Sequence, residues 1–244
     1  MEIAGIPTRD IAIPDAIREL RPNDVIEAVW ENPLGGVTFR IGAPKPWAFV
    51  KWAPAGSGLD LSAEIVRLRW AEPFTRVPHV LGEGSNDAGS WLLTRAVPGQ
   101  SAVSARWLQD PVTAVRAVGA GLRALHDALP VGECPFSWSV ADRAGRLTRD
   151  ARAALPHVPP IDRLVVCHGD ACAPNTLIGD GGEWAAHVDL GLLGVADCWA
   201  DLAVATWSTE WNYGPGFEGA LLDAYGVAPD KARMSFYRTL WDLE

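Results

Sequence analysis

Three polar residues in the second half of the chain could perform phosphoryl transfer. Asp170 and Asn175 are five positions apart and follow a β-like apolar run, and Asp189 follows the next such run. Because both runs end in loops, the three side chains can point into one cleft. Phosphoryl transfer needs one carboxylate that orients the acceptor hydroxyl and takes its proton, and oxygen ligands that hold Mg²⁺ on the phosphates. Carboxylate and amide oxygens suit Mg²⁺, which is a hard cation.

The spacing of these residues is that of two kinase loops. Asp170 and Asn175 match the D-x-x-x-x-N catalytic loop, and Asp189 begins a D-x-G metal loop. Asp170 and Asn175 could instead be ordinary turn residues beside Gly169 and Pro174. The D-x-G sequence at a kinase-like distance favours a phosphoryl-transfer site.

A second indication comes from Lys51 and Glu64 in the first half of the chain. Lys51 shares a strand face with Trp47 and Phe49, where a lysine is costly unless it is paired. Glu64 lies on the apolar stripe of the helix predicted to follow Asp60. A strand lysine and an inward glutamate on the next helix hold the α- and β-phosphates in kinases. Alternatively, Lys51 extends from an edge strand into solvent and Glu64 lies at the margin of the stripe.

Two further segments are candidates for nucleotide binding. Gly35 and Gly36 lie in a hairpin whose glycines would let the backbone approach phosphates closely, although two such glycines often only make a turn. The hairpin is not a Walker loop, because no G-K-[ST] sequence follows it. Thr94 and Ala96 lie where a hinge backbone would meet the base, which is an assignment by position.

The order of elements predicts a two-lobed α+β fold. Strands are expected at residues 25–32, 35–42, 47–53 and 90–97, which gives a β-rich nucleotide-binding lobe over residues 1–97. The hinge is expected near residues 94–99. A long amphipathic helix over residues 111–129 and two or three helical pieces after Ala196 give a mainly helical lobe over residues 98–244. This second lobe would carry the catalytic and acceptor-binding groups.

Composition narrows the possible partners. The formal net charge of −9 argues against nucleic-acid binding and favours a cationic small molecule. The sequence has no apolar run long enough to cross a bilayer and no signal-peptide pattern at its N-terminus, so no membrane partner and a cytoplasmic location are expected. The four cysteines form no C-x-x-C pair, which is consistent with that compartment.

Zinc binding and cysteine chemistry are weaker alternatives. Cys167, His168 and Cys172 could bind zinc with Cys198 as a fourth ligand, but the spacing fits no common zinc pattern. A nucleophilic role for Cys167 is disfavoured, because this cysteine precedes the loop and is expected to point into a core. The remaining histidines are expected to be structural or exposed rather than catalytic: His79, His126, His157 and His187.

The chain resembles the aminoglycoside phosphotransferase family, in particular its 3′-phosphotransferase branch. The resemblance is carried by CHGDACAPN, VDLGLLGVAD, WADLAVATWSTEWNYGPG and FYRTLWDL, and it extends from about Gly35 to the C-terminus. It implies a protein-kinase-like fold that uses Mg²⁺ and ATP or GTP to phosphorylate a hydroxyl of an aminoglycoside, and hence antibiotic resistance. The resemblance implies that Asp170 is the catalytic carboxylate and that Asn175 and Asp189 hold magnesium. It also implies that Lys51 and Glu64 form the ion pair that binds the nucleotide phosphates. Thr94 and Ala96 would contact the base through their backbone. His168 and Asp201 would brace the catalytic loop.

The chain departs from the family pattern at three places. Leu192 and Trp207 occupy positions where family members have arginines, and the segment between residues 136 and 168 is shorter than the helical excursion that carries acidic antibiotic contacts in the family. Glu210, Asp242 and Glu244 could supply the negative charge for an amino sugar instead.

Two other functions remain open at the level of sequence. One is a kinase of the same fold that acts on another amino sugar, a choline-like amine or a metabolite hydroxyl, which the three departures support. The other is a nucleotide-binding pseudokinase that serves as a scaffold, although a scaffold would not need all five of the kinase-like residues at 51, 64, 170, 175 and 189.

Overall fold

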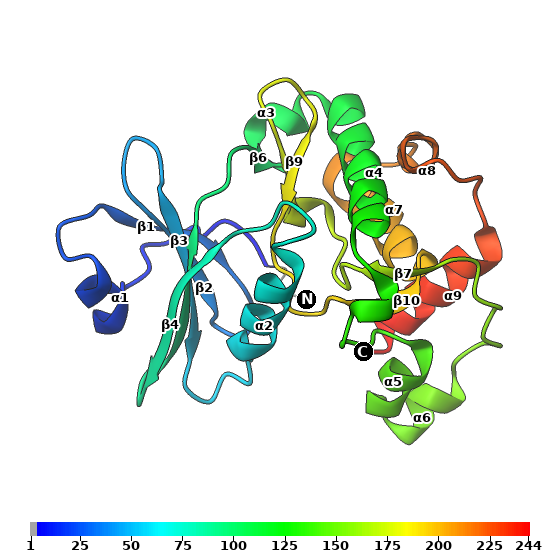
Figure 1. Ribbon diagram of the computed structural model, residues 1–244, viewed down its shortest axis with the longest axis horizontal. Helices are drawn as coiled ribbons and strands as arrows, with labels where there is room; N and C mark the ends of the chain where they lie inside the picture. Colours follow the sequence, from blue (N-terminus) through cyan, green and yellow to red (C-terminus); the bar gives the residue numbers. More distant parts are fainter. Residues whose placement is uncertain (1–3) are drawn as a thin grey trace. The chain divides into compact units, whose positions relative to one another are not determined.

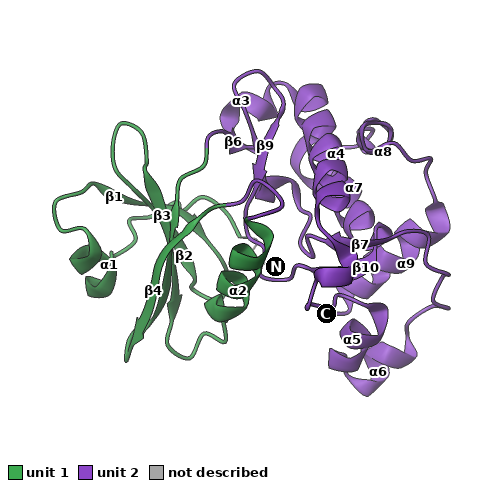
Figure 2. Ribbon diagram, in the orientation of Figure 1, with its two compact units in different colours: residues 1–72, 78–97 green, residues 73–77, 98–244 purple. Residues whose placement is uncertain are grey.

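The computed structural model describes residues 4–244 and divides into two compact units (Figure 2). The first unit comprises Met1–Glu72 and Pro78–Val97, and the second comprises Pro73–Val77 and Pro98–Glu244. One sheet dominates the first unit, whereas the second is mainly helical. The α+β class predicted from the sequence is confirmed.

Five antiparallel strands form the sheet of the first unit, in the order β1-β2-β3-β5-β4 (Figure 1). These strands are β1 (Ile26–Glu31), β2 (Val37–Ile41), β3 (Ala48–Pro54), β4 (Val80–Asn86) and β5 (Gly89–Arg95). Each of them except β4 lies where the alternation of apolar and polar residues predicts a strand.

The two faces of β3 have different partners. Val50 is fully buried in the hydrophobic core, and Ile17 of α1 (Asp15–Leu20) packs into the same core. The next residue along the strand, Lys51, points to the opposite face, where α2 (Leu61–Ala71) lies (Figure 1). Helix and strand therefore bring a lysine and a glutamate together on the side of the sheet away from its main core.

The second unit contains the remaining helices and two small sheets. The α-helices are α3 (Ala105–Leu108), α4 (Pro111–Ala128), α5 (Val140–Arg146), α6 (Arg149–Ala153), α7 (Trp199–Tyr213), α8 (Glu218–Tyr225) and α9 (Lys231–Asp242). The single-turn 3₁₀ helices are η1 (Val131–Glu133) and η2 (Ala173–Asn175). The strands are β6 (Gln100–Ser101), β7 (Leu164–Cys167), β8 (Thr176–Ile178), β9 (Trp184–His187) and β10 (Gly194–Asp197), with β7 paired to β10 and the other three in the order β6-β8-β9.

Helix α4 runs through the second unit and packs most extensively against α8. Asp110 caps its first turn by accepting a hydrogen bond from the backbone N–H of Thr113, and Pro111 begins the helix. Gly119 allows the close contact with α8, because a Cβ at this position would lie 2.3 Å from the carbonyl oxygen of Leu221. Between residues 4 and 244 no helix, α4 included, combines the length and the apolar character needed to span a membrane.

The sequence patterns do not predict α1, α3, α5, α6, β4, β6, β8 or β10. Most of these elements are short, and β4 carries two glycines and a polar end that hide its alternation. Helices α5 and α6 fill the segment that is short relative to the family pattern, so this segment is folded rather than a simple loop.

We expect Gly119→Ala to destabilise the protein by about 1–3 kcal/mol, because the new methyl group would push α8 away from α4. Urea unfolding followed by circular dichroism would measure the effect. Gly145→Ala is the matched control: this glycine lies in α5 with no heavy atom near the position of a Cβ, so alanine should be neutral or slightly stabilising. An equal response of the two variants would contradict the packing argument.

Candidate active site

The loop that follows β7 is held from behind by one buried carboxylate. Asp201, near the start of α7, accepts hydrogen bonds from the backbone N–H groups of His168 (2.6 Å) and Gly169 (3.0 Å). Gly169 has φ +87°, and a Cβ there would lie 2.2 Å from the carbonyl oxygen of Leu192, so only glycine fits. The expected bracing of the loop by Asp201 is confirmed, and it fixes the backbone directly before Asp170.

His168 is fully buried and holds the loop to the neighbouring strand connection. Its Nε2 lies 3.0 Å from the carbonyl oxygen of Val188, and its Nδ1 accepts from the backbone N–H of Asp170 at 3.3 Å. Both ring nitrogens are therefore engaged in hydrogen bonds within the protein. His168 therefore braces the loop, as expected, and has no free nitrogen with which to act as a base.

Asp170 is positioned by Asn175 through two hydrogen bonds. The Asn175 Nδ2 group donates to Asp170 Oδ2 and to the Asp170 carbonyl oxygen, each at 3.0 Å. The other carboxylate oxygen, Asp170 Oδ1, is buried and accepts no hydrogen bond from the described residues. A buried acceptor without a donor is costly, and this oxygen is where an incoming hydroxyl would bind.

The second carboxylate of the motif, Asp189, lies close enough to change the properties of Asp170. Burial raises the pKa of Asp170, and the negative charge of Asp189 raises it further, whereas Cys172, His168 and Asn175 oppose these effects. A backbone bond from Val188 N–H to the Asn175 carbonyl oxygen (3.0 Å) brings the two loops together. Asp189 itself has φ +64°, a left-handed conformation that is uncommon for a residue other than glycine.

These residues fit a divalent cation. Both hydrogen bonds of the Asn175 amide to Asp170 use its nitrogen, so its carbonyl oxygen is left to act as a ligand. Asp189 supplies a carboxylate, and a cation between the loops would relieve its repulsion with Asp170. Hard oxygen donors of this kind suit Mg²⁺.

The first unit contains the predicted ion pair. Lys51 Nζ lies 2.9 Å and 2.8 Å from the two carboxylate oxygens of Glu64. Only 7% of the Glu64 side chain is exposed, compared with 25% of Lys51, so the glutamate is the more deeply buried member of the pair. The pair fixes the lysine in a position from which it can bind an anion.

The other predicted nucleotide-binding positions are tied to local structure. The side chain of Asn32 accepts from the N–H of Gly36, and Gly35 adopts φ +81°, so the two glycines shape the β1–β2 turn. Thr94 lies on β5, with its hydroxyl 3.4 Å from the carbonyl oxygen of Phe49. The N–H of Ala96 donates to the carbonyl oxygen of Trp47 (2.9 Å), so any contact of Ala96 with a base must use its carbonyl oxygen.

The three acidic residues expected near the acceptor lie in different environments. Glu210 and Asp242 are exposed on α7 and α9, two helices that pack together. The carboxylate of Glu244, in contrast, pairs with the fully buried guanidinium of Arg143, with Nη2–Oε2 and Nε–Oε1 distances of 2.8 Å and 3.1 Å. The side chain of Glu244 is therefore already neutralised within the protein, which the sequence does not reveal.

The positions that depart from the family pattern are also resolved. Leu192 is 37% exposed, and its backbone supports Gly169. The ring of Trp207 packs against that of Trp211 at a centroid distance of 4.9 Å. The guanidinium of Arg238, from α9, lies 5.7 Å from the centroid of the Trp207 ring. A positive charge thus stands beside position 207 although the residue there is a tryptophan.

The cysteines do not form the zinc site considered above. Cys167 is buried, and its Sγ lies 3.3 Å from the carbonyl oxygen of Asp197. Burial raises its pKa well above the ordinary value, so the thiol is neutral and unreactive. Both nitrogens of His168 are engaged elsewhere in the loop. The described contacts therefore support structural roles for these residues.

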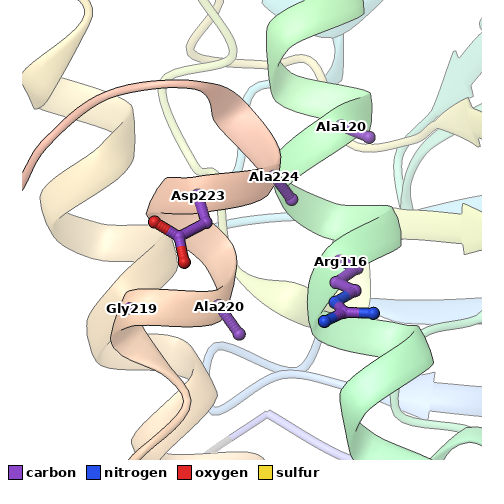
Figure 3. A pocket seen from close by; sticks show the side chains of 6 residues that line it. All are labelled: Arg116, Ala120, Gly219, Ala220, Asp223 and Ala224. Carbon is purple, nitrogen blue, oxygen red and sulfur yellow. The ribbon is translucent and has the colours of Figure 1, made fainter.

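A cavity of about 510 Å³ lies in the second unit between α4 and α8 (Figure 3). Its lining residues are Arg116, Ala120, Gly219, Ala220, Asp223 and Ala224. None of them belongs to the loop from His168 to Asn175, and most are small side chains without catalytic groups. This cavity is a packing feature of the two helices rather than the site of phosphoryl transfer.

Comparisons with known proteins identify relatives in sequence and in fold. A family profile described as a phosphotransferase enzyme family matches residues 139–237. The chain is 33% identical over 260 aligned residues to an aminoglycoside 3′-phosphotransferase of Streptomyces fradiae, covering 92% of this chain and 97% of the relative. The crystal structure of an aminoglycoside-3′-phosphotransferase of type VIII has a TM-score of 0.77 and 32% identity, covering 94% of this chain and 98% of that chain. The structure of aminoglycoside phosphotransferase APH(3'')-Id from Streptomyces rimosus in complex with ADP and streptomycin has a TM-score of 0.67 and 29% identity, covering 85% and 90%.

A loop with this arrangement of carboxylates, on a fold shared with these structures, defines a nucleotide-dependent phosphotransferase of protein-kinase-like architecture, as the sequence predicts. The chain belongs to the aminoglycoside phosphotransferase family. The alignment with the first relative is longer than this chain of 244 residues, so that relative has residues without a counterpart here. This agrees with the expectation that a segment of the family pattern is shortened.

We expect Asp170→Asn to raise the melting temperature of the metal-free protein at pH 7. Because the pKa of Asp170 is raised in the folded protein, ionisation of this carboxyl destabilises the fold at pH values above its ordinary pKa of 3.8. The destabilisation decreases as the pH falls from the raised pKa toward 3.8 and is then lost. Thermal unfolding in the presence of a chelator, between pH 4.5 and 8, would therefore show a difference that shrinks toward acid pH. Asp87→Asn, at an exposed turn, is the control and should show no such trend. A melting temperature of Asp170→Asn at or below the wild-type value at pH 7 would contradict the prediction.

Proposed function

We propose that this protein transfers the γ-phosphoryl group of ATP or GTP to a hydroxyl group of an aminoglycoside, with Mg²⁺ as cofactor. The observation that carries the proposal is the environment of Asp170. One of its oxygens is held by Asn175, the other is buried without a donor, and Asp189 adds a second carboxylate nearby. This is the arrangement that an acceptor hydroxyl and a metal-bound phosphate would complete.

The residues of the chain then have distinct roles. Asp170 Oδ1 accepts the hydrogen bond of the acceptor hydroxyl, orients its oxygen toward the γ-phosphorus and takes its proton during transfer. Asn175 and Asp189 hold Mg²⁺, which when bound neutralises charge on the phosphate oxygens. Lys51, held by Glu64, binds the α- and β-phosphates. The turn at Gly35 and Gly36 covers the phosphates, and Thr94 and Ala96 lie beside the base.

The acceptor is proposed from charge and from the relatives. Aminoglycosides carry several ammonium groups, and the chain has a net charge of −9 with exposed carboxylates at Glu210 and Asp242. The relatives include a 3′-phosphotransferase and a structure with ADP and streptomycin bound. We infer action at a 3′-type hydroxyl, in the cytoplasm where ATP is available, without a nucleic-acid or membrane partner. Glu244 contributes less than the other two acidic residues, because its carboxylate is paired with Arg143.

A kinase of the same fold that acts on a different amine or metabolite is the second candidate. It is favoured by Leu192 and Trp207, which replace family arginines, and by the relative's additional residues. A nucleotide-binding scaffold is less consistent with a catalytic carboxylate that keeps an unpartnered buried oxygen, since that feature costs stability without aiding binding.

A coupled nucleotide-turnover assay across a panel of aminoglycosides tests the proposal. The panel contains members with and without a 3′-hydroxyl, as well as streptomycin, each with ATP or GTP and Mg²⁺. We expect stimulation only by members with a 3′-hydroxyl, and mass spectrometry should find one added phosphate on the acceptor. Stimulation by streptomycin alone would move the transfer to another position. Magnesium-dependent nucleotide binding without turnover on any member would overturn the choice of acceptor.

Asp170→Ala should reduce kcat by at least about 10³-fold, because it removes the group that orients and deprotonates the acceptor. Nucleotide affinity should stay within about twofold of wild type, since the phosphates are bound by other residues. Isothermal titration with a nonhydrolysable nucleotide would provide the second value. An equal loss of binding and turnover would contradict the catalytic role of Asp170.

Lys51→Met should weaken nucleotide binding and lower kcat/KM by about 10²-fold through loss of the phosphate contact. It also removes the ion-pair partner of the buried Glu64 carboxylate, which should cost about 1–3 kcal/mol of stability. The double variant Lys51→Met, Glu64→Gln separates the two effects, because it also removes the buried carboxylate charge without restoring the ammonium. We expect it to regain stability in urea unfolding but not activity. Recovery of activity together with stability would show that Lys51 acts only structurally.

A further inference from the structure

A chain of buried hydrogen bonds leads from the end of α8 through α4 to the catalytic loop. The hydroxyl of Tyr225, the last residue of α8, lies 2.8 Å from Nδ1 of His126 on α4. Nε2 of the same imidazole lies 2.9 Å from Asp201 Oδ2. That oxygen also accepts from the N–H of His168, and Asp201 Oδ1 accepts from the N–H of Gly169. Three side chains thus connect a helix remote in sequence with the two peptide groups that precede Asp170.

The ionisation states of Asp201 and Tyr225 determine which atom donates in each of these hydrogen bonds. Burial of Asp201 alone would raise its pKa, but the hydrogen bond from His126 and the bond from the backbone N–H of His168 outweigh burial, and the pKa is lowered. The carboxylate is therefore ionised, so Nε2 of His126 must carry the hydrogen that it shares. Burial raises the pKa of Tyr225 well above its ordinary value, so the phenol keeps its proton and donates it to Nδ1. The phenol thus selects the imidazole tautomer that donates to Asp201.

The orientation of each ring is fixed by its surroundings. The rings of Tyr225 and His126 meet edge to face at a centroid distance of 5.5 Å, and the guanidinium of Arg123 lies 5.9 Å from the centroid of the tyrosine ring. The side chains of His126 and Asp201 have no exposed surface, so no water competes for their hydrogen bonds. The hydroxyl of Tyr225 also contacts the thiol of Cys198, and His126 Nδ1 is its nitrogen acceptor at 2.8 Å.

A metal site is the alternative use of this cluster. Nε2 or Nδ1 of His126, Sγ of Cys167 and a carboxylate oxygen of Asp201 lie within 4.8 Å of one another. Each group already has a partner: Cys167 Sγ lies 3.3 Å from the Asp197 carbonyl oxygen, and Asp201 is bound by the imidazole and two backbone N–H groups. Binding a cation would release the catalytic loop, so the geometry favours the hydrogen-bonded chain.

We propose that Tyr225 is a positioning residue for phosphoryl transfer, acting through His126 and Asp201 on the backbone of the catalytic loop. This inference rests on the proposed catalytic role of Asp170. Tyr225 touches neither substrate nor the reacting atoms. It fixes the imidazole that holds Asp201, and Asp201 fixes the peptide groups whose conformation places the Asp170 carboxylate.

The first test is Tyr225→Phe, which removes one oxygen and keeps the ring. We expect kcat to fall about fivefold, the size of effect expected for one hydrogen bond, with KM for nucleotide and acceptor unchanged. Hydrogen–deuterium exchange of the peptide that contains residues 168–170 should become faster. Tyr213→Phe is the matched control: its hydroxyl donates to the Ala102 carbonyl oxygen (2.7 Å) outside this chain of bonds, so it should lose comparable stability without a change in kcat or in exchange of the loop.

Two variants of His126 test whether the hydrogen bonds act in series from Tyr225 through His126 to Asp201. The amide nitrogen of His126→Gln can replace Nε2 as a donor to Asp201, whereas the shorter side chain of His126→Asn cannot reach it. His126→Gln should therefore keep kcat within about threefold of Tyr225→Phe, and His126→Asn should lose at least about tenfold more. In the His126→Gln background, Tyr225→Phe should have no further effect on kcat, because the bond that it removes is already absent.

Two outcomes would overturn the inference: unchanged kcat in Tyr225→Phe, or an additive loss when Tyr225→Phe is combined with His126→Gln. The exchange measurement does not depend on turnover. If the wild-type protein phosphorylates none of the aminoglycosides, the proposed acceptor fails, whereas faster exchange at residues 168–170 in Tyr225→Phe alone would still support positioning of the loop. Exchange equal to that of wild type would count against it.

Discussion

The conformation of the loop from His168 to Asn175 depends on the buried negative charge of Asp201. A carboxylate removed from water is costly unless hydrogen bonds compensate for its lost hydration. Asp201 has three donors, of which two are backbone N–H groups of the catalytic loop and one is an imidazole on another helix. Because the loop turns through the left-handed conformation of Gly169, a single side chain fixes the path of the backbone into Asp170. The position of Asp170 thus depends on the hydrogen bonds that join the loop to Asp201 on α7 and, through it, to His126 on α4.

The proposed catalytic residues have fewer stabilising hydrogen bonds than the groups that support them. Asp170 has a buried oxygen without a donor and a like charge nearby, and Asp189 has an unusual backbone conformation. Such features cost stability and are retained where substrate or metal can relieve them. Lys51 differs, because Glu64 compensates its charge before any ligand arrives. Lys51 is thus stabilised by its ion pair before any ligand binds, whereas Asp170 and Asp189 would be stabilised by a bound hydroxyl and a bound cation.

Sequence reasoning succeeded where the signal was local or periodic. Alternation predicted β3 and the separation of Val50 from Lys51, and helical spacing predicted that Glu64 points inward. The contact of Asp170 with Asn175 spans five residues and was expected from a motif. The contact of Tyr225 with His126 spans 99 residues, and that of Arg143 with Glu244 spans 101. No local pattern distinguishes a buried tyrosine that packs from one that donates to a particular imidazole, so such contacts appear only when the chain is folded.

The expected departures from the family pattern include Leu192 and Trp207, whereas Lys51, Glu64, Asp170, Asn175 and Asp189 match the kinase pattern. Trp207 stands where the family pattern has an arginine, yet Arg238 of α9 reaches the same region and places its guanidinium near the tryptophan ring. Arg238 also donates to the carbonyl oxygen of Ala203 and pairs with Glu218, so its charge is anchored on α7 and α8 rather than carried by position 207. A guanidinium fixed by several acceptors has less freedom to follow a ligand than one on an exposed side chain. Because the proposed chemistry at Asp170 requires only a correctly placed hydroxyl, these differences would change which amine-bearing molecule fits without changing how its hydroxyl reacts.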